Sequence, residues 1–275
     1  MIHEIVHLKD HFPMLEFDIT LETYCPDNFN EFSKGRKRKA VIVFPGGGYE
    51  FLSEREAEPV ALRFAGNDLA SFVLKYTVKP QMKPPYPIVD ALAAVAYVRK
   101  NARKYNVDED KICVCGFSAG GHLAATAGAY YWEKEYLDFL KLKEEDTKVN
   151  GCILGYPVIL DVGHQVTMNA ISDGDPERKA KFSIEKHVTE KYPKTFIWHT
   201  TMDTCVPVSN SLLLAKALED KKILFEMHIY PALDHGQSLA DESVYADDFP
   251  KEMLEDMRPN RVWINNAIDF IKKYI

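Results

Sequence analysis

The sequence contains no apolar run that approaches the roughly 18 residues of a membrane-spanning helix. Its first residues, MIHEIVHLKD, also lack the continuous apolar stretch and the small-residue cleavage site of a secretory signal peptide. Cysteine is scarce, and the 5 cysteines are an odd number without the spacing of a disulfide framework. These absences predict a cytoplasmic protein with free thiols that does not enter a membrane.

Basic charge is not in excess either. The chain has 34 Lys and Arg residues against 41 Asp and Glu residues, which gives a formal net charge of −7. A nucleic-acid-binding surface would require a basic patch, so we expect no nucleic-acid partner. Internal repeats and low-complexity segments are also missing, and 275 residues are enough to bury a sizeable core.

Short apolar segments alternate with longer amphipathic ones along the chain. Segments such as VIVF, CILG and TFIW are continuously apolar, which is typical of strands buried on both faces. The predicted strands are Leu15–Tyr24, Ala40–Phe44, Ser71–Tyr76, Lys111–Cys115, Gly151–Gly155, Thr195–His199 and Ile223–Tyr230. Helical periodicity occurs in Ile88–Tyr105, Ser209–Asp220 and Val262–Tyr274. This alternation predicts an α/β fold with a mostly parallel central sheet flanked by helices.

Two stretches interrupt the alternation. Thr77–Pro87 contains four prolines and is predicted to be a loop. Asp161–Tyr192 is long, charged and poorly periodic, and it lies between two buried strands. We expect it to form a small cap over one end of the sheet and to lie outside the core. The chain is therefore predicted to be a single domain, residues 1–275, with one insertion at residues 161–192.

The most informative motif is Gly116-Phe-Ser118-Ala-Gly120, which directly follows the predicted strand KICVC and precedes the helical pattern Gly121–Ala129. Strand, G-x-S-x-G and helix in this order define a nucleophile elbow. Flanking glycines allow the strand and helix backbones to pass closely. The serine then lies at the tip, beside N–H groups of the helix N-terminus that point at an incoming anion. Ser118 is thus the predicted nucleophile.

A second glycine-rich segment, Pro45-Gly-Gly-Gly-Tyr49, directly follows the strand VIVF. Three consecutive glycines are entropically costly to order, so they suit a place where the backbone must approach a ligand. Acyl transfer requires N–H donors aimed at the developing oxyanion. We expect Gly47 and Gly48, together with the N–H of Ala119, to form this oxyanion hole.

The base and its orienting acid are expected at the ends of later strands. Asp203 follows the strand TFIWH, and His235 follows the strand ILFEMHIYP, so both lie at the same sheet edge as Ser118. Serine needs an imidazole to accept its proton, and a carboxylate holds that imidazole in the correct tautomer. The order Ser, Asp, His along the chain agrees with the order that accompanies the nucleophile elbow.

Other histidines and one aspartate are weaker candidates. His228 lies inside a predicted strand, and His199 precedes the acid in the chain, although it could line the site. Asp234 is adjacent to His235 and would have to turn back onto the ring of its neighbour. His122 lies in the first turns of the helix after the elbow, where we expect it to form a structural hydrogen bond.

No metal or cofactor site is predicted. His3, His7 and His11 recur every four residues, but the apolar residues around them form no clean helical face and no carboxylate is well placed as a further ligand. The three glycines are not followed by the Gly-Lys-Ser/Thr of a phosphate-binding loop. Cys205 is two residues from Asp203, so it could be exposed near the site, but packing is the favoured interpretation.

Several motifs occur together in an order that resembles a known family: PGGGY, LKYTV, PIVDALAAVAYVRKNA, GFSAGGHLAA, WHTTMDTCVP and DHG. They resemble the α/β-hydrolase esterases related to hormone-sensitive lipase, and most of all a bacterial branch of acetyl-xylan-esterase-like and feruloyl-esterase-like sugar hydrolases. The resemblance covers the chain from Ala40 onward. It implies an α/β-hydrolase fold and hydrolysis of carboxylic esters, often acetyl groups on sugars, without a cofactor.

The resemblance assigns its roles to residues already singled out: nucleophile Ser118, acid Asp203, base His235, and oxyanion glycines Gly47 and Gly48. This sequence departs from the family pattern at one position. Many relatives have a histidine before the three glycines, where this chain has Pro45. Because that histidine usually orders the loop, the geometry of the loop has to be established separately.

The sequence therefore predicts a serine esterase that removes short acyl groups, chiefly acetyl, from small sugars through an acyl-enzyme. Tyr49, followed by the bulky Glu50 and Phe51, is expected to bind substrate beside the acyl pocket. The charged insertion at residues 161–192 does not offer the broad apolar lid of a lipase. Two alternatives stay open. One is a serine peptidase of the prolyl-oligopeptidase type, and the other is a non-catalytic ligand-binding protein on the same fold.

Overall fold

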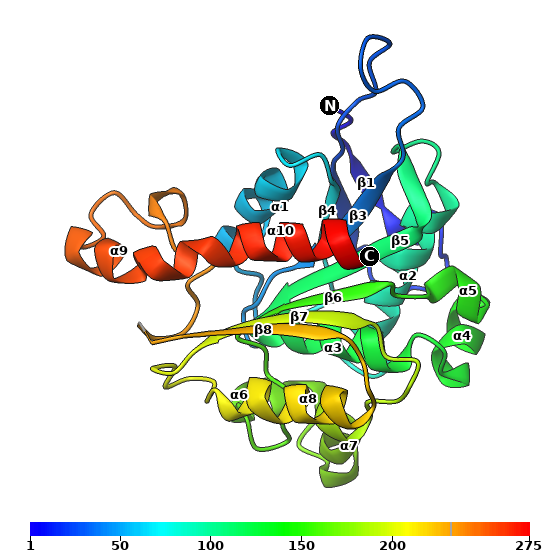
Figure 1. The fold of residues 1–275 in the computed structure, drawn as a ribbon. Helices are drawn as coiled ribbons and strands as arrows, with labels where there is room; N and C mark the ends of the chain where they lie inside the picture. The colour runs from blue at the N-terminus through cyan, green and yellow to red at the C-terminus, as the bar shows by residue number, and fades with distance from the viewer. Residues whose placement is uncertain (232) are drawn as a thin grey trace.

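A computed structural model describes residues 1–231 and 233–275, and in them eight strands form one central sheet in the order β1-β2-β4-β3-β5-β6-β7-β8 (Figure 1). The strands are β1 Ile5–His7, β2 Thr20–Tyr24, β3 Arg38–Phe44, β4 Ala70–Lys75, β5 Val107–Phe117, β6 Gly151–Gly155, β7 Lys194–Thr200 and β8 Phe225–Tyr230. Strand β2 pairs antiparallel with β1 and β4, and the remaining neighbours are parallel. The predicted mostly parallel sheet is confirmed.

The N-terminal strands differ most from the sequence-based expectation. The prediction of one strand over Leu15–Tyr24 is correct only for β2, because residues 15–19 are irregular with a bend at 16–17. The side chains of Leu15 and Ile19 are nevertheless buried. Strand β1 was not predicted. It has three residues, of which only Val6 is buried, so its apolar pattern is too short to recognise.

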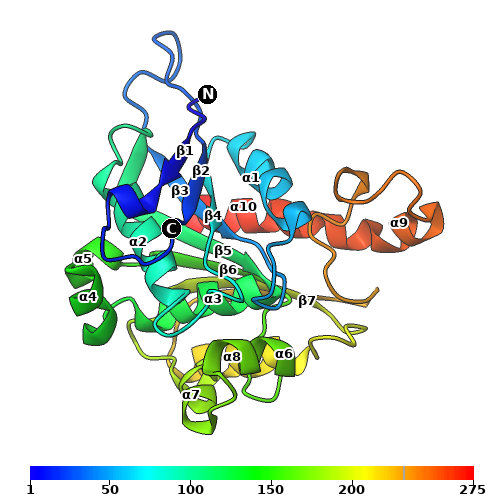
Figure 2. The same cartoon turned by 180° about the vertical axis from the view of Figure 1, so that it is seen from behind.

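Helices cover both faces of the sheet (Figures 1 and 2). Their bounds are α1 Glu58–Ala65, α2 Ile88–Lys100, α3 Ser118–Tyr130, α4 Lys134–Leu140, α5 Glu144–Thr147, α6 Gln165–Ser172, α7 Pro176–Lys181, α8 Ser209–Asp220, α9 Lys251–Met257 and α10 Trp263–Tyr274. Helices α2, α3 and α8 bury their apolar side chains in one cluster, and α1 and α10 contribute to a second cluster on the opposite face. The three predicted helices all occur, although α2 ends before the predicted boundary Tyr105.

The insertion at residues 161–192 forms α6 and α7, and the expectation that it lies outside the core is wrong. Met168, Ile171 and Ile184 are at most 3% exposed and belong to the same apolar cluster as α2 and α3. The charged residues of the segment face outward instead, and α7 has no buried residue. Both views place α6 and α7 beside α8 (Figures 1 and 2).

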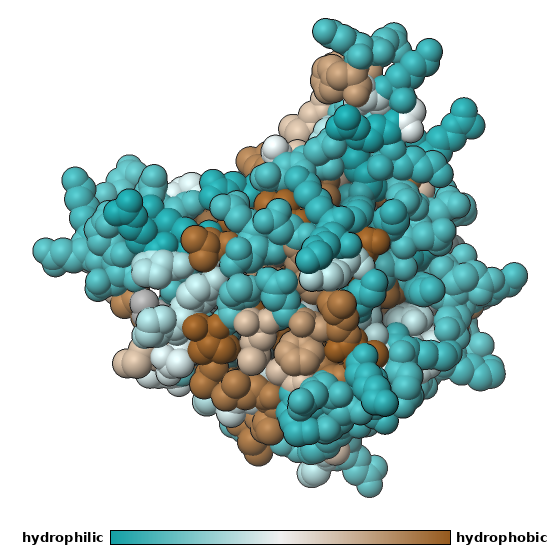
Figure 3. Space-filling view, in the orientation of Figure 1, coloured by the Kyte–Doolittle hydropathy of each residue, from teal (hydrophilic) through white to brown (hydrophobic). Residues whose placement is uncertain are grey.

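The outer surface is largely hydrophilic on the face shown in Figure 3, and apolar side chains gather there over β8 and α8. Strand β8 ends the sheet and is half-buried throughout its length, and Leu212 and Leu213 of α8 are exposed. Within the described residues, none of the helices combines the length and apolarity needed to cross a bilayer.

Candidate active site

The nucleophile elbow lies where β5 ends and α3 begins. Ser118 is the first residue of α3 and has a positive φ of 52°, a backbone conformation that residues other than glycine rarely adopt. A Cβ atom on Gly116 would lie 2.1 Å from the carbonyl oxygen of Gly120, and a Cβ on Gly120 would lie 2.1 Å from that of Phe44. Both glycines are therefore required by close backbone contacts, as the strand–turn–helix motif predicts.

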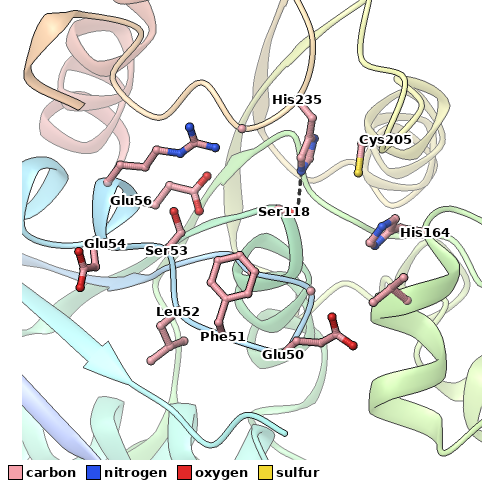
Figure 4. A pocket seen from close by; sticks show the side chains of 15 residues that line it. Glu50, Phe51, Leu52, Ser53, Glu54, Glu56, Ser118, His164, Cys205 and His235 are labelled. Carbon is pink, nitrogen blue, oxygen red and sulfur yellow. Dashed lines mark hydrogen bonds between the residues drawn. The ribbon is translucent and has the colours of Figure 1, made fainter. Parts of the chain in front are cut away.

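The side chains of Ser118, His235 and Asp203 form one hydrogen-bonded line. His235 Nε2 lies 2.8 Å from Ser118 Oγ (Figure 4). On the other side of the ring, His235 Nδ1 lies 2.6 Å from Asp203 Oδ2. The structure thus brings together the three predicted side chains, which come from the ends of β5, β7 and β8. This arrangement suits an imidazole that accepts the serine proton while the carboxylate orients its ring.

Asp203 is held by hydrogen bonds on both carboxylate oxygens. Its Oδ1 accepts the backbone N–H groups of Cys205 and Val206, and its Oδ2 also lies 3.2 Å from His199 Nε2. Burial by itself would raise the Asp203 pKa, but the hydrogen bonds from His199 and His235 outweigh burial and lower that pKa. Asp203 is therefore a carboxylate at neutral pH, as an orienting acid must be.

The weaker candidates have other partners. Asp234 accepts hydrogen bonds from Thr204 and from the backbone N–H of His235, so it orders the loop and does not contact the imidazole ring. His228 lies 2.8 Å from Glu226 on the edge strand. His199 is fully buried beside Asp203 and does not line the cleft.

The oxyanion loop consists of residues 45–51, directly after β3. Gly47 and Gly48 have positive φ angles of 124° and 66°. In the part of the chain that is described, their N–H groups donate no hydrogen bond, and both residues line the cleft in front of Ser118. The N–H of Ala119 lies in the first turn of α3, where no carbonyl of the helix can accept it. These three N–H groups remain the candidate oxyanion donors.

Tyr49 does not occupy the position expected of a substrate-binding residue. Its side chain is fully buried, and its hydroxyl lies 2.9 Å from Nδ1 of His122 on α3. A positive φ of 64° at Tyr49 turns this side chain inward, and Glu50 and Phe51 line the cleft in its place. The hydroxyl of Tyr49 gives His122 the structural hydrogen bond that the sequence predicted, and burial lowers the His122 pKa to about 4.

The cleft in front of Ser118 has a volume of about 720 Å³ (Figure 4). One wall is the segment from Gly47 to Glu56, which is rich in glutamate. The opposite wall contains His164, Val166 and Cys205. The interpretation of Cys205 as a packing residue is wrong, because the residue is exposed and lines this wall.

Comparison with known proteins identifies the family. The BD-FAE family model matches residues 24–218, which is more than half of the chain. The chain belongs to the BD-FAE family. A solved structure, the acetyl ester-xyloside bifunctional hydrolase from Caldicellulosiruptor lactoaceticus, is 33% identical to this BD-FAE protein. The alignment has a TM-score of 0.76 and covers 96% of each chain.

Two curated relatives of the BD-FAE protein are longer than it. Endo-1,4-beta-xylanase B of Butyrivibrio fibrisolvens is 36% identical over 222 residues, which cover 76% of this chain and 34% of the relative. Acetylxylan esterase of Xylanibacter ruminicola is 27% identical over 232 residues, which cover 80% of this chain and 44% of the relative. The chain thus spans about a third to a half of their length.

These comparisons confirm the predicted α/β-hydrolase fold and the predicted resemblance to acetyl-xylan-esterase-like proteins. The relatives of the BD-FAE protein that these comparisons find are named as esterases and related hydrolases. Over the described ranges 1–231 and 233–275, no cluster of three His, Cys, Asp or Glu side chains could hold a metal ion.

Some residues of the BD-FAE site were not found from the sequence. Glu56 lines the cleft but is one of four glutamates between residues 50 and 58, and nothing in the sequence distinguishes it. His164 caps the N-terminus of α6, where its Nδ1 lies 2.8 Å from the Thr167 hydroxyl. Burial and the neighbouring His235 lower the His164 pKa. No sequence signal marked His164, because histidine is not among the residues preferred at a helix N-cap.

Proposed function

We propose that this protein is a serine esterase that hydrolyses short-chain acyl esters of small sugars through an acyl-enzyme. The single observation that supports this function best is the line from Ser118 through His235 to Asp203 at the edge of a cleft. In acylation, Ser118 Oγ attacks the ester carbonyl carbon while His235 Nε2 takes the hydroxyl proton. His235 Nδ1 then carries a proton toward Asp203, whose negative charge stabilises the imidazolium.

The attack turns the carbonyl oxygen into an oxyanion. The N–H groups of Gly47, Gly48 and Ala119 are the donors that would stabilise it, and removal of one such donor elsewhere costs about 10² to 10³ in kcat. When the tetrahedral intermediate collapses, the bond to the sugar oxygen breaks and His235 returns its proton to that leaving oxygen. Ser118 now carries the acyl group.

Deacylation repeats the same steps with water as the nucleophile. His235 takes a proton from the water as it attacks the acyl carbon, and the same donors stabilise the second oxyanion. Collapse then breaks the bond to Ser118 Oγ, which regains its proton from His235. The products are a free carboxylic acid and a free enzyme, so atoms and charge balance without a cofactor in these steps.

A small, polar alcohol agrees with the composition of the cleft. Its lining combines a few apolar side chains, Phe51, Leu52 and Val166, with the polar side chains of Glu50, Glu54, Arg55 and His164. Carboxylates and imidazole can hydrogen-bond sugar hydroxyl groups, while a long acyl chain would need a larger apolar surface. The names of the relatives, an acetylxylan esterase and an acetyl ester-xyloside hydrolase, point to acetylated xylo-sugars.

The acyl preference is tested with nitrophenyl esters from acetyl to dodecanoyl. A methylene that fits an apolar pocket improves binding by about 0.8 kcal/mol, and one that clashes costs at least as much. We expect kcat/KM to be highest between acetyl and butyryl and to fall steeply by octanoyl. A maximum at octanoyl or beyond would contradict the short-acyl proposal.

The alcohol is tested by acetate release from acetylated xylo-oligosaccharides. If the enzyme hydrolyses nitrophenyl acetate but releases no acetate from these sugars, the esterase proposal stands and the proposal of a sugar substrate is rejected. Labelling of Ser118 by a fluorophosphonate separates an enzyme from a ligand-binding protein on the same fold. Faster cleavage of prolyl peptide amides than of any ester would instead favour the serine peptidase.

A further inference from the structure

The carboxylate of Glu56 bridges two backbone segments beneath the catalytic cleft. Glu56 ends a short 3-10 helix, Glu54–Glu56, and its side chain is almost completely buried, with a residue exposure of 3%. One oxygen, Oε2, accepts the backbone N–H of Gly46 at 2.8 Å. The other oxygen, Oε1, accepts the hydroxyl of Tyr156 at 2.7 Å. Gly46 is the residue directly before the candidate oxyanion donor Gly47.

From Tyr156 the hydrogen bonds continue to the loop that carries the base. The Tyr156 hydroxyl accepts the backbone N–H of Ser238 at 2.8 Å, and Ser238 is three residues after His235. The Tyr156 ring also packs edge-on against the His235 ring, with centroids 4.9 Å apart and an interplanar angle of 70°. A buried chain thus runs from Gly46 through Glu56 and Tyr156 to Ser238.

The sheet alone does not hold these two loops in register. The oxyanion loop follows β3 and the His235 loop follows β8, and three strands, β5, β6 and β7, separate β3 from β8 in the sheet. Both loops must nevertheless be aligned to a fraction of an ångström for Ser118, its base and its oxyanion donors to act on one carbonyl group. Tyr156 follows β6 and therefore lies between them.

We propose that Glu56 is a positioning residue of the esterase, which sets the oxyanion loop relative to the His235 loop. This hydrogen-bonded bridge suits a chain that has Pro45 before its glycines, because the proline side chain has no donor or acceptor that could order the loop. The Pro45 carbonyl is instead held by the Tyr76 hydroxyl at 2.5 Å, and Glu56 holds the next residue, Gly46. A Cβ on Gly46 would lie 2.7 Å from Glu56 Oε2 and 2.8 Å from the Phe117 carbonyl oxygen, so the two contacts together require a glycine there.

A carboxylate is required because both oxygens of Glu56 act as acceptors. Glutamine has almost the same shape but one NH₂ group, which donates only. In Glu56→Gln this NH₂ must face either the Gly46 N–H or the Tyr156 hydroxyl. Against Gly46 it meets another donor, and against Tyr156 it forces that hydroxyl to accept where it now donates. Glutamine therefore either loses the contact to Gly46 or leaves the buried Tyr156 hydroxyl proton without its acceptor, while the volume is kept.

The test, which rests on the proposed esterase function, compares Glu56→Gln with the wild-type enzyme on nitrophenyl acetate. Because a displacement of about 1 Å can cost about 10² in rate, we expect kcat to fall by about 10- to 100-fold. KM should change by less than about threefold, since Glu56 acts on the oxyanion donors and not on the ground-state ester. Glu58→Gln, an exposed residue in the first turn of α1, is the matched control and should keep wild-type kcat.

A second variant, Tyr156→Phe, keeps the ring against His235 but removes the hydroxyl that joins Glu56 to Ser238. We expect a smaller fall in kcat, again with little change in KM, and it provides the test if Glu56→Gln does not fold. The rate of Ser118 phosphonylation by a fluorophosphonate should fall in parallel with kcat, because the phosphonyl oxygen uses the same donors.

Three results would overturn the inference. The first is a kcat within threefold of wild type in a folded Glu56→Gln. The second is a loss of kcat only in proportion to the fraction of enzyme unfolded, measured by circular dichroism. The third is a rise in KM alone. A wild-type enzyme that neither turns over esters nor reacts with the fluorophosphonate would instead reject the proposed function itself.

Discussion

Two glycine-containing turns meet beside Ser118, and they are built in different ways. The elbow, Gly116–Gly120, is shaped by contacts between backbones, since a Cβ on either end glycine would lie 2.1 Å from a carbonyl oxygen. The oxyanion loop, residues 45–51, is shaped by positive φ angles and by side chains from elsewhere in the chain. The conformation of the elbow is therefore determined by its own backbone contacts. The conformation of the oxyanion loop depends on side chains that are distant in the sequence.

This difference explains why the elbow is recognisable as a motif while the loop is not fully described by its glycines. The elbow needs only the strand before it, the helix after it and the neighbouring strand end. The loop needs Glu56, Tyr76 and His122, which are 10, 31 and 73 residues from the loop residues that they contact. Substitutions in the two turns should accordingly differ in kind, as the following predictions specify.

The largest effect is expected at the tip of the elbow. Ser118→Ala removes the proposed nucleophile, and loss of the nucleophile in a comparable triad costs on the order of 10⁶ in kcat. Because alanine adopts the same backbone conformation as serine at similar cost, the melting temperature should stay close to that of the wild type. Turnover of nitrophenyl acetate measures the loss, and more than about a tenth of the wild-type activity would contradict the assignment.

The next largest loss of kcat is expected at only one of the two aspartates near His235, namely Asp203 and not Asp234. Asp203→Asn presents an amide to His235 and favours the wrong imidazole tautomer, an effect worth about 10⁴ in kcat elsewhere. Asp234→Asn alters only the loop contacts to Thr204 and the His235 backbone, so we expect a loss of less than about tenfold. The kcat values of the two variants, measured side by side, test this prediction. Equal losses of kcat would contradict the role of Asp203 as the orienting acid.

Within the oxyanion loop, the two donor glycines should respond unequally to alanine. Gly47 has a φ of 124°, and a Cβ there would lie 2.1 Å from the Phe51 carbonyl oxygen, so Gly47→Ala must displace the loop. Gly48 has a φ of 66°, and its Cβ would approach only Val166, at 3.5 Å. This left-handed conformation costs alanine roughly 1–2 kcal/mol.

We therefore expect kcat to fall by about 100-fold or more in Gly47→Ala, given what one oxyanion donor contributes. In Gly48→Ala we expect a fall of less than about tenfold. Measured kcat for nitrophenyl acetate, with the melting temperature as the folding control, tests this order. The reverse order would show that the loop geometry around the oxyanion is different from the one described.

The smallest effect concerns the contact between the oxyanion loop and helix α3, Tyr49 to His122, and it appears in stability and not in catalysis. His122 is buried and its pKa is lowered to about 4, whereas an unfolded histidine has a pKa of about 6.5. At a pH between these two pKa values, His122 is therefore protonated in the unfolded chain and neutral in the folded chain. The stability that neutral His122 contributes is fully present above about pH 6.5 and is lost as the pH falls toward 4, by up to about 3 kcal/mol.

Urea unfolding at several pH values between 7.5 and 4.5 measures this loss as a decline in the free energy of unfolding. His122→Gln has no titrating ring and should be less stable at pH 7.5 but should decline less steeply with falling pH. A wild-type and variant enzyme with the same pH slope would contradict a buried, neutral His122.

Much of the fold could be predicted from the sequence because parallel strands buried on both faces leave continuous apolar runs, as in β3, β6 and β7. The short edge strand β1 could not be, since a single buried residue makes no pattern. Residues 161–192 were misjudged for a related reason. Their apolar residues are few and irregularly spaced among charges, yet a segment of this size can still direct Met168, Ile171 and Ile184 into the core.

Of the candidate site, the sequence by itself singled out Ser118, Asp203, His235 and the two glycine turns, because each is tied to a strand end by a short local pattern. Only the tertiary structure decided which of four nearby glutamates is buried, since Glu56 differs from Glu50, Glu54 and Glu58 in its partners and not in its chemistry. In the same way, only the structure shows that Tyr49 has a positive φ, with its side chain directed toward His122 and away from the cleft. Such choices depend on contacts between segments up to 100 residues apart, which no local pattern records.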